Sequence, residues 1–197
     1  RWSLIANVYL GRVARVVPAI DAAFVELGLE KAGFLGAAQA SPRRRRAEGT
    51  DDPVPGIAEQ VHEGEAVLVQ VSNDPIGDKG PKLTADIALP GRYLVHTPFQ
   101  DGVALSRRIE DANERDRLAR LVGESIVRHG LTGVIVRTAA EGASGDDIDS
   151  EMALFAEQWA GLMDKRAQSQ APVLLHRDLD PVSRALRDFL AGDVEQV

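Results

Sequence analysis

The stretch IANVYLGRVARVVPAIDAAFVELGLEKAGFLG, residues 5–36, decides the fold of the first half of this chain. It contains three short β-rich runs that are separated by turn-sized gaps: residues 5–17, 22–27 and 31–36. Two further runs of the same kind follow: residues 65–72 and 83–89. Five short strands in succession predict a small closed β-barrel, which we expect to occupy residues 1–89.

The third and fourth runs are joined by SPRRRRAEGTDDPVPG, residues 41–56. This segment has no apolar periodicity and is rich in proline, glycine and charge, so it predicts a mobile loop. The basic run Arg43 to Arg46 within it is typical of a solvated loop, although a flexible basic arm would add salt-sensitive affinity for RNA. A short helix is expected next, within IAEQVHEG.

The second half of the chain mixes strands with helices. Further strands are expected at four places: residues 93–98, 103–109, 134–136 and 171–176. Asp111, with Glu114 in a capping-box-like position, begins a helix that ends at Gly130, and Ser144 caps a helix with one apolar stripe. Asp180 followed by proline predicts another helix start. The fold class is therefore α+β, a barrel followed by an α/β module at residues 90–181.

The composition limits which classes of protein this chain can belong to. Thirty acidic and 23 basic residues give a net charge of −7, which argues against indiscriminate binding of nucleic acid, so any such contact needs a local patch. No apolar run reaches the length of about 18 residues typical of a transmembrane segment. There is no cysteine for a disulfide or a thiolate metal site. We expect a cytoplasmic protein.

Two phenylalanines are candidates for an exposed binding surface. Strand alternation places Ala23, Val25 and Leu27 on one face, so Phe24 should point to the other. Leu35 is the natural core residue of the next strand, which sends Phe34 outward as well. Two outward aromatic rings on adjacent strands suit the stacking of unpaired bases. The alternative is that both rings pack against the second module.

The loop DPIGDKGPKLT, residues 74–84, carries Lys79 and Lys82 among glycines and prolines. Exposed lysines beside glycines allow a phosphate backbone to approach closely. The loop lacks the G-x-x-x-x-G-K-[ST] order of a P-loop, and it is equally compatible with an ordinary solvated hairpin.

The stretch GVIVRTAAEG, residues 133–142, is a buried strand that ends in Arg137 and Thr138. A guanidinium and a hydroxyl at the point where a strand surfaces can bind a phosphate. They can also serve the fold alone, with Arg137 paired to a carboxylate and Thr138 bonded to nearby backbone.

No complete catalytic arrangement is present in the sequence. The four histidines lack metal-ligand spacing, and there is no nucleophile elbow and no cysteine nucleophile. The acidic cluster GDDIDSE, residues 145–151, has the ligand chemistry for Mg²⁺. Its place in the first turns of a helix favours compensation of the helix dipole instead. We therefore expect no catalytic residue and no metal ligand in this chain.

Four segments, in order, resemble the N-terminal half of the ribonuclease E/G family of bacterial endoribonucleases. They are NVYLGRVARVVPAIDAAFVELGLEKAGFLG, VHEGEAVLVQVSNDPIGDKGPKLTADIALPGRYLVHTP, SRRI and GVIVRTAAEG. The resemblance implies that the barrel is an OB-fold RNA-binding domain of the ribosomal-protein S-one type. It also implies that the α/β module is a 5′-sensor with affinity to the RNase H fold, and that residues 182–197 begin a truncated RNase H-like portion.

The resemblance also implies roles for individual residues. Phe24, Phe34 and Lys79 match the positions that contact single-stranded RNA. Arg137 and Thr138 match the pair that binds a 5′-monophosphate, and Gly91 and Val95 match positions near the 5′ nucleotide. The implied partners are single-stranded RNA, preferably 5′-monophosphorylated, and further copies of the same protein in a homo-oligomer. Asn73 stands where some relatives carry a basic residue, which weakens the predicted RNA groove.

In the family, hydrolysis depends on carboxylates that hold Mg²⁺ in a DNase I-like domain, and we expect that domain to lie beyond Val197. The resemblance thus implies the RNA-binding and 5′-end-sensing part of a Mg²⁺-dependent endoribonuclease of RNA processing, including rRNA processing, and mRNA decay. Two other hypotheses remain: a stand-alone RNA-binding adaptor without nuclease activity, and a protein-interaction module that uses Phe24 and Phe34.

Overall fold

The computed structural model describes residues 3–42, 54–179 and 183 of the chain. Its first half is a closed barrel of five strands: β1 (Val8–Val17), β2 (Ala22–Glu26), β3 (Gly33–Gly36), β4 (Ala66–Asn73) and β5 (Lys82–Thr84). The strand order is β1-β2-β3-β5-β4, and β4 pairs again with β1 to close the barrel. Only the β3–β5 pair in this barrel is parallel. The predicted five-stranded OB-fold barrel is confirmed.

Alternation along the strands fills the barrel with aliphatic side chains. On β2 and β3 the inward residues Ala23, Val25 and Leu35 are fully buried. Gly33 is required where β3 crosses β5, because a Cβ there would lie 2.5 Å from a methyl carbon of Leu83. The core of the barrel therefore consists of small and branched residues in close contact.

Three short helical segments complete the first half: η1 (Pro18–Ile20), α1 (Ala37–Ala40) and α2 (Ile57–Gln60). The expected helix after the loop corresponds to α2. The single turn α1 was not predicted from the sequence. Most of the predicted mobile loop at 41–56, including the basic run, lies outside the described residues.

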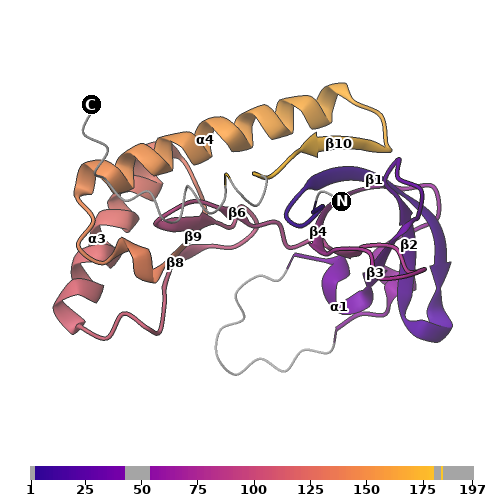
Figure 1. The fold of residues 1–197 in the computed structure, drawn as a ribbon, viewed down its shortest axis with the longest axis horizontal. Helices are drawn as coiled ribbons and strands as arrows, with labels where there is room; N and C mark the ends of the chain where they lie inside the picture. The colour runs from indigo at the N-terminus through magenta and orange to yellow at the C-terminus, as the bar shows by residue number, and fades with distance from the viewer. Residues whose placement is uncertain (1–2, 43–53, 180–182, 184–197) are drawn as a thin grey trace.

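The second half is built on a four-stranded sheet with the order β6-β7-β9-β8. Its strands are β6 (Leu89–Pro90), β7 (Leu94–His96), β8 (Gly102–Leu105) and β9 (Gly133–Val136). The helices are α3 (Ala112–His129), the short η2 (Thr138–Ala140) and α4 (Gly145–Gln168). Figure 1 shows α3 beside the sheet and α4 running along it toward the barrel. The predicted α/β module is confirmed.

The caps predicted at Asp111, Gly130 and Ser144 are present in α3 and α4. The Asp111 carboxylate accepts the backbone N–H groups of Asn113 and Glu114, and Gly130 ends α3 in the left-handed conformation, with φ 66°. Ser144 and Asp147 form a reciprocal capping box at the start of α4. Glu114 does not complete a box with Asp111, because its carboxylate binds Arg117 and the backbone N–H of Gly142 instead.

The chain returns to the barrel through β10 (Val173–His176), which pairs antiparallel with the N-terminal part of β1. The two halves also share one apolar core, in which Val8, Leu10 and Leu68 of the barrel join the side chains of α3, α4 and the second sheet. The proposed boundaries at 89 and 181 remain a prediction. The final helix and the RNase H-like portion lie outside the described residues except Ser183. Within the described ranges, no helix combines the length and hydropathy needed to span a bilayer.

Candidate nucleic-acid interface

Phe24 and Phe34 face each other across β2 and β3 on the outer surface of the barrel. They are direct cross-strand partners, and their ring centroids are 6.1 Å apart with the rings at 74°. Both side chains are half-buried, whereas their neighbours Val25 and Leu35 point into the core. The barrel residues that pack on the second module come from β1 and β4, so the alternative in which the two rings serve that contact is wrong.

Lys79 and Lys82 border an open groove that contains both rings, with a volume of about 690 Å³. The loop that carries Lys79 lies against the barrel, because a Cβ at Gly80 would be only 1.8 Å from the carbonyl oxygen of Ala32. This close approach is possible only for glycine. The structure therefore brings Phe24, Phe34 and Lys79 together in one groove.

The charges of this groove are arranged for an anionic ligand. Lys31, from the connection between β2 and β3, donates to the carbonyl of Gly77 and lies 3.6 Å from the Asp78 carboxylate, so the charge of Asp78 faces a cation. Lys79 and Lys82 remain exposed at the edge of the aromatic pair. Aromatic faces for bases and ammonium groups for phosphates are the two elements of a single-strand binding surface.

The second candidate group lies at the end of β9. Arg137 donates from one guanidinium nitrogen to the carbonyls of Gly91 (2.5 Å) and Arg92 (3.2 Å), and its backbone N–H donates to Tyr93. Thr138 opens η2 directly after it, and both side chains are half-buried. Gly91 and Arg137 thus lie in contact.

Val95 lies on β7, next to this contact. It pairs with Ile135 of β9 and is half-buried, and the adjacent pair is Leu94 with Val136. Of the four residues predicted for the 5′ end, Gly91 lies in the turn before β7, Val95 lies on β7, and Arg137 and Thr138 directly follow the neighbouring strand β9.

Glu151 of α4 holds the turn of Gly91 in place, and sequence reasoning missed this role. Its carboxylate accepts three consecutive backbone N–H groups, from Arg92 (2.5 Å), Tyr93 (3.0 Å) and Leu94 (2.8 Å). Burial raises the pKa of Glu151, while these hydrogen bonds and the charge of Arg137 act in the opposite direction.

Gly91 must be glycine beside this carboxylate, because a Cβ would lie 2.4 Å from Glu151 Oε1 and 2.8 Å from the Phe155 ring. A signal for Glu151 was available in the sequence. Glu151 follows Ile148 by three residues and precedes Phe155 by four, so it is a charged residue beside the buried stripe of the helix.

The acidic cluster at 145–151 has divergent partners. Asp147 caps the helix with Ser144, as the dipole interpretation suggested. Asp149 instead accepts hydrogen bonds from Ser125 (2.6 Å) and Arg128 (2.5 Å), and its Oδ1 lies 3.1 Å from His129 Nε2. The hydrogen bond from Ser125 is the main cause that lowers the pKa of Asp149. Within the described ranges, no three His, Asp or Glu side chains form a group that could hold a metal ion.

Comparison with known proteins links this arrangement to one family. The family model of the ribonuclease E/G family matches residues 88–197, which include Gly91, Val95, Arg137 and Thr138. The whole chain is 39% identical to ribonuclease G of Escherichia coli over 200 residues, and 36% identical over 197 residues to ribonuclease G of Haemophilus influenzae. It is also 39% identical over 194 residues to ribonuclease E of a Nostoc species.

The chain spans only part of these relatives. All of it aligns with the Escherichia coli protein, of which it covers 40%. The Haemophilus and Nostoc alignments each include 98% of the chain and cover 40% and 27% of those proteins. The matches extend over both the barrel and the second module. The chain belongs to the ribonuclease E/G family.

Proposed function

We propose that this chain binds single-stranded RNA on the barrel and recognises its 5′-monophosphate end, as part of a Mg²⁺-dependent endoribonuclease of RNA processing and decay. The observation that carries the proposal is the groove in which Phe24, Phe34 and Lys79 lie together. Its aromatic part accepts any base, because every base has a π-face, and its lysines attract the backbone. Membership of a ribonuclease family agrees with this ligand.

Phe24→Ala is expected to weaken binding of a single-stranded RNA octamer about tenfold and to change the unfolding temperature little, since a stacked base contributes roughly 1–3 kcal/mol. The ring lies on the outer face of β2, outside both apolar cores. Fluorescence anisotropy and thermal unfolding measure the two quantities.

Two controls frame this result. Leu35→Ala, on the inner face of β3, should destabilise the fold by about 2–5 kcal/mol. Leu154→Ala removes an exposed side chain of α4 and should leave both RNA affinity and stability unchanged. Unfolding of the Phe24 variant would show that the ring belongs to the core and would refute its proposed role in stacking RNA bases.

The proposed 5′-end site uses Arg137 and Thr138 as donors to a terminal phosphate. The contacts with Gly91 and Arg92 orient the guanidinium at the end of β9. A planar guanidinium presents parallel N–H groups to phosphate oxygens, and the neighbouring hydroxyl offers a further donor. A 5′-hydroxyl end offers no charge to this pair, and a triphosphate is larger than the monophosphate to which the pair is matched.

One RNA oligomer with a 5′-monophosphate, a 5′-triphosphate or a 5′-hydroxyl tests this assignment. We expect the monophosphate to bind about tenfold more tightly than the hydroxyl, and Arg137→Lys to remove most of that difference, because lysine lacks the planar fork. Arg107→Lys, at an exposed position, is the matched control. Equal affinities of the three oligomers for the unaltered protein would eliminate the 5′-end site.

The remaining parts of the proposal concern the whole protein. The carboxylates of the described residues do not fit a Mg²⁺ site, because those of the acidic cluster have separate partners. Asp147 caps α4, Asp149 binds side chains of α3, and Glu151 accepts backbone N–H groups of the turn after β6. We therefore assign Mg²⁺ to the part of the family's sequence that this chain does not cover. A homo-oligomer acting on RNA in the cytoplasm completes the proposal.

A further inference from the structure

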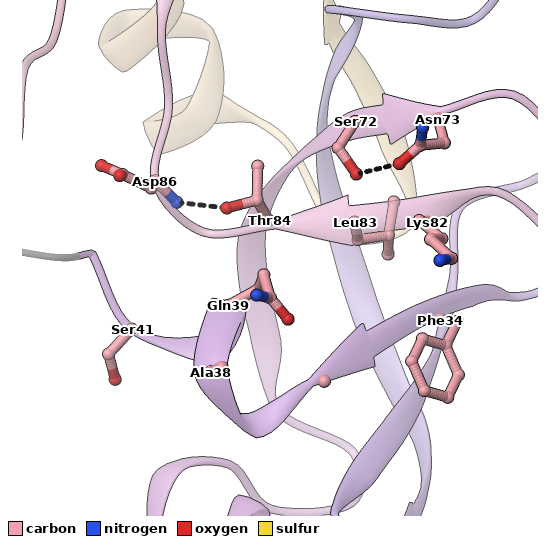
Figure 2. Close-up of a pocket in the computed structure, with 11 residues that line it drawn as sticks. Phe34, Ala38, Gln39, Ser41, Ser72, Asn73, Lys82, Leu83, Thr84 and Asp86 are labelled. Atoms are coloured by element: carbon pink, nitrogen blue, oxygen red, sulfur yellow. Dashed lines mark hydrogen bonds between the residues drawn. The ribbon is translucent and has the colours of Figure 1, made fainter. Parts of the chain in front are cut away.

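A second hollow on the barrel adjoins the groove that contains Phe24, Phe34 and Lys79, which we call the aromatic groove. It has a volume of about 490 Å³ and lies between α1, β3, β5 and the end of β4. Phe34 and Lys82 line both hollows, so the two are continuous across this pair. In Figure 2, Phe34 and Lys82 lie at one end of the hollow, and Ser41 and Asp86 lie at the other.

The lining of this hollow is more polar than that of the aromatic groove, because it includes two side-chain amides and three hydroxyls. Gln39 projects from α1 toward β5, and Asn73 ends β4 on the far side of β5. The Asn73 amide oxygen accepts from Ser72 (3.2 Å), and Thr84 accepts the backbone N–H of Asp86 (3.1 Å). These contacts fix the orientation of the polar groups around the hollow.

Gln39 is the polar group best placed to receive a ligand. Its backbone carbonyl accepts the N–H of Ala85 (2.8 Å), which ties α1 to the end of β5. A Cβ at Gly36 would lie only 3.0 Å from Gln39 Oε1, so glycine at that position leaves room for the amide. The Gln39 side chain is exposed, and no hydrogen bond joins its amide to another of the described residues.

We infer that this hollow is a base-reading subsite for the nucleotide next to the one that stacks on Phe34, with Gln39 and Asn73 as the groups that contact the base. The inference rests on the proposed function, since the occupant is the same RNA strand. Continuity through Lys82 supports this occupant, because one ammonium group between two hollows suits the phosphate that joins two nucleotides.

The charge of the hollow favours a base over a phosphate as its occupant. Asp86 contributes a carboxylate whose two oxygens both lie 3.1 Å from Gln100 Nε2, and it would repel a phosphate placed beside it. A neutral base edge has no such penalty. An amide offers a donor beside an acceptor, which is the pattern that reads base edges, whereas the aromatic pair accepts every base.

The inference is tested with RNA octamers of uniform sequence, oligo-U, oligo-A and oligo-C, each with a 5′-hydroxyl so that the 5′-end site is not engaged. We expect the unaltered chain to bind the best of the three at least about fivefold more tightly than the worst. Gln39→Ala should weaken the best ligand about fivefold and reduce that spread, and Asn73→Ala should act in the same direction. Gln168→Ala, at an exposed position of α4, is the matched control.

A second variant separates base reading from shape. Gln39→Glu keeps the side-chain length but replaces the amide donor by an acceptor, so the order of preference should shift toward cytosine, whose amino group donates. Phe34→Ala should instead weaken all three octamers together.

The outcomes distinguish the subsite from the proposed function. If Phe24→Ala weakens binding while both amide variants leave affinity and spread unchanged, the subsite is wrong and RNA binding on the barrel stands. If no octamer binds the unaltered chain, or neither phenylalanine matters, both ideas fall. Thermal unfolding of each variant confirms that the fold is intact.

Discussion

Glu151→Ala is expected to lower the free energy of unfolding by about 3 kcal/mol, because it leaves three backbone N–H groups without their acceptor. These groups belong to Arg92, Tyr93 and Leu94, and the carboxylate that they share projects from α4, far away in the sequence. Denaturant titration at pH 7 measures the change. A loss below about 0.5 kcal/mol would contradict the role assigned to this carboxylate.

The oxygens of Glu151, rather than its charge, account for this stabilisation. Burial raises the pKa of the carboxyl group in spite of its three hydrogen bonds, so the ionised form gains nothing overall from its surroundings. Glu151→Gln keeps one acceptor oxygen and should therefore cost less than Glu151→Ala. Glu157→Ala, at an exposed position of the same helix, controls for the loss of a carboxylate and should change stability by less than about 0.5 kcal/mol.

The same substitution has a consequence for the proposed 5′-end site. Arg137 is oriented by the carbonyls of Gly91 and Arg92, and Glu151 fixes the turn that carries them. We expect Glu151→Ala to reduce the preference for a 5′-monophosphate in molecules that remain folded, while binding of a 5′-hydroxyl octamer through the barrel is retained.

The barrel could be predicted from the sequence because its signals are local. Alternation with a period of two identified the inward residues of β2 and β3, and the same alternation placed Phe24 and Phe34 outward. A cross-strand pair on adjacent strands needs no further information than their register. The aromatic part of the candidate site could therefore be predicted from the sequence alone.

Contacts between distant elements could not be predicted in this way. The run at 171–176 was recognised as a strand, but nothing local shows that β10 pairs with β1. Likewise, Glu151 appeared as one acid in a cluster at a helix start, and only the packing of α4 against the turn after β6 reveals its three backbone partners. Gln39 lies in a single turn of helix that has no periodic signal.

Acid is expected to destabilise the chain through His96, lowering the free energy of unfolding by about 2 kcal/mol between pH 7.5 and pH 5. His96 of β7 is 1% exposed, and its ring lies 5.7 Å from that of Phe155 and 6.0 Å from that of Trp159, between centroids. Its Nδ1 has no hydrogen-bond partner among the described residues. Burial lowers the pKa of His96 from 6.5 to about 4.

The direction in which pH changes the free energy of unfolding follows from whether the folded or the unfolded chain binds the proton. Between pH 6.5 and about pH 4 the unfolded chain takes up a proton at His96 and the folded chain does not, so stability is present above pH 6.5 and is lost as the pH falls through this window. Urea titrations at several pH values should show this slope, and His96→Leu should remove most of it.

Burial also lowers the pKa of His176, which adds to the slope in both proteins and cancels in the comparison. His62→Gln, at an exposed position, should keep the full slope. Equal slopes for the unaltered protein and His96→Leu would contradict this assignment, because they would show that the pKa of His96 is the same in the folded and unfolded states.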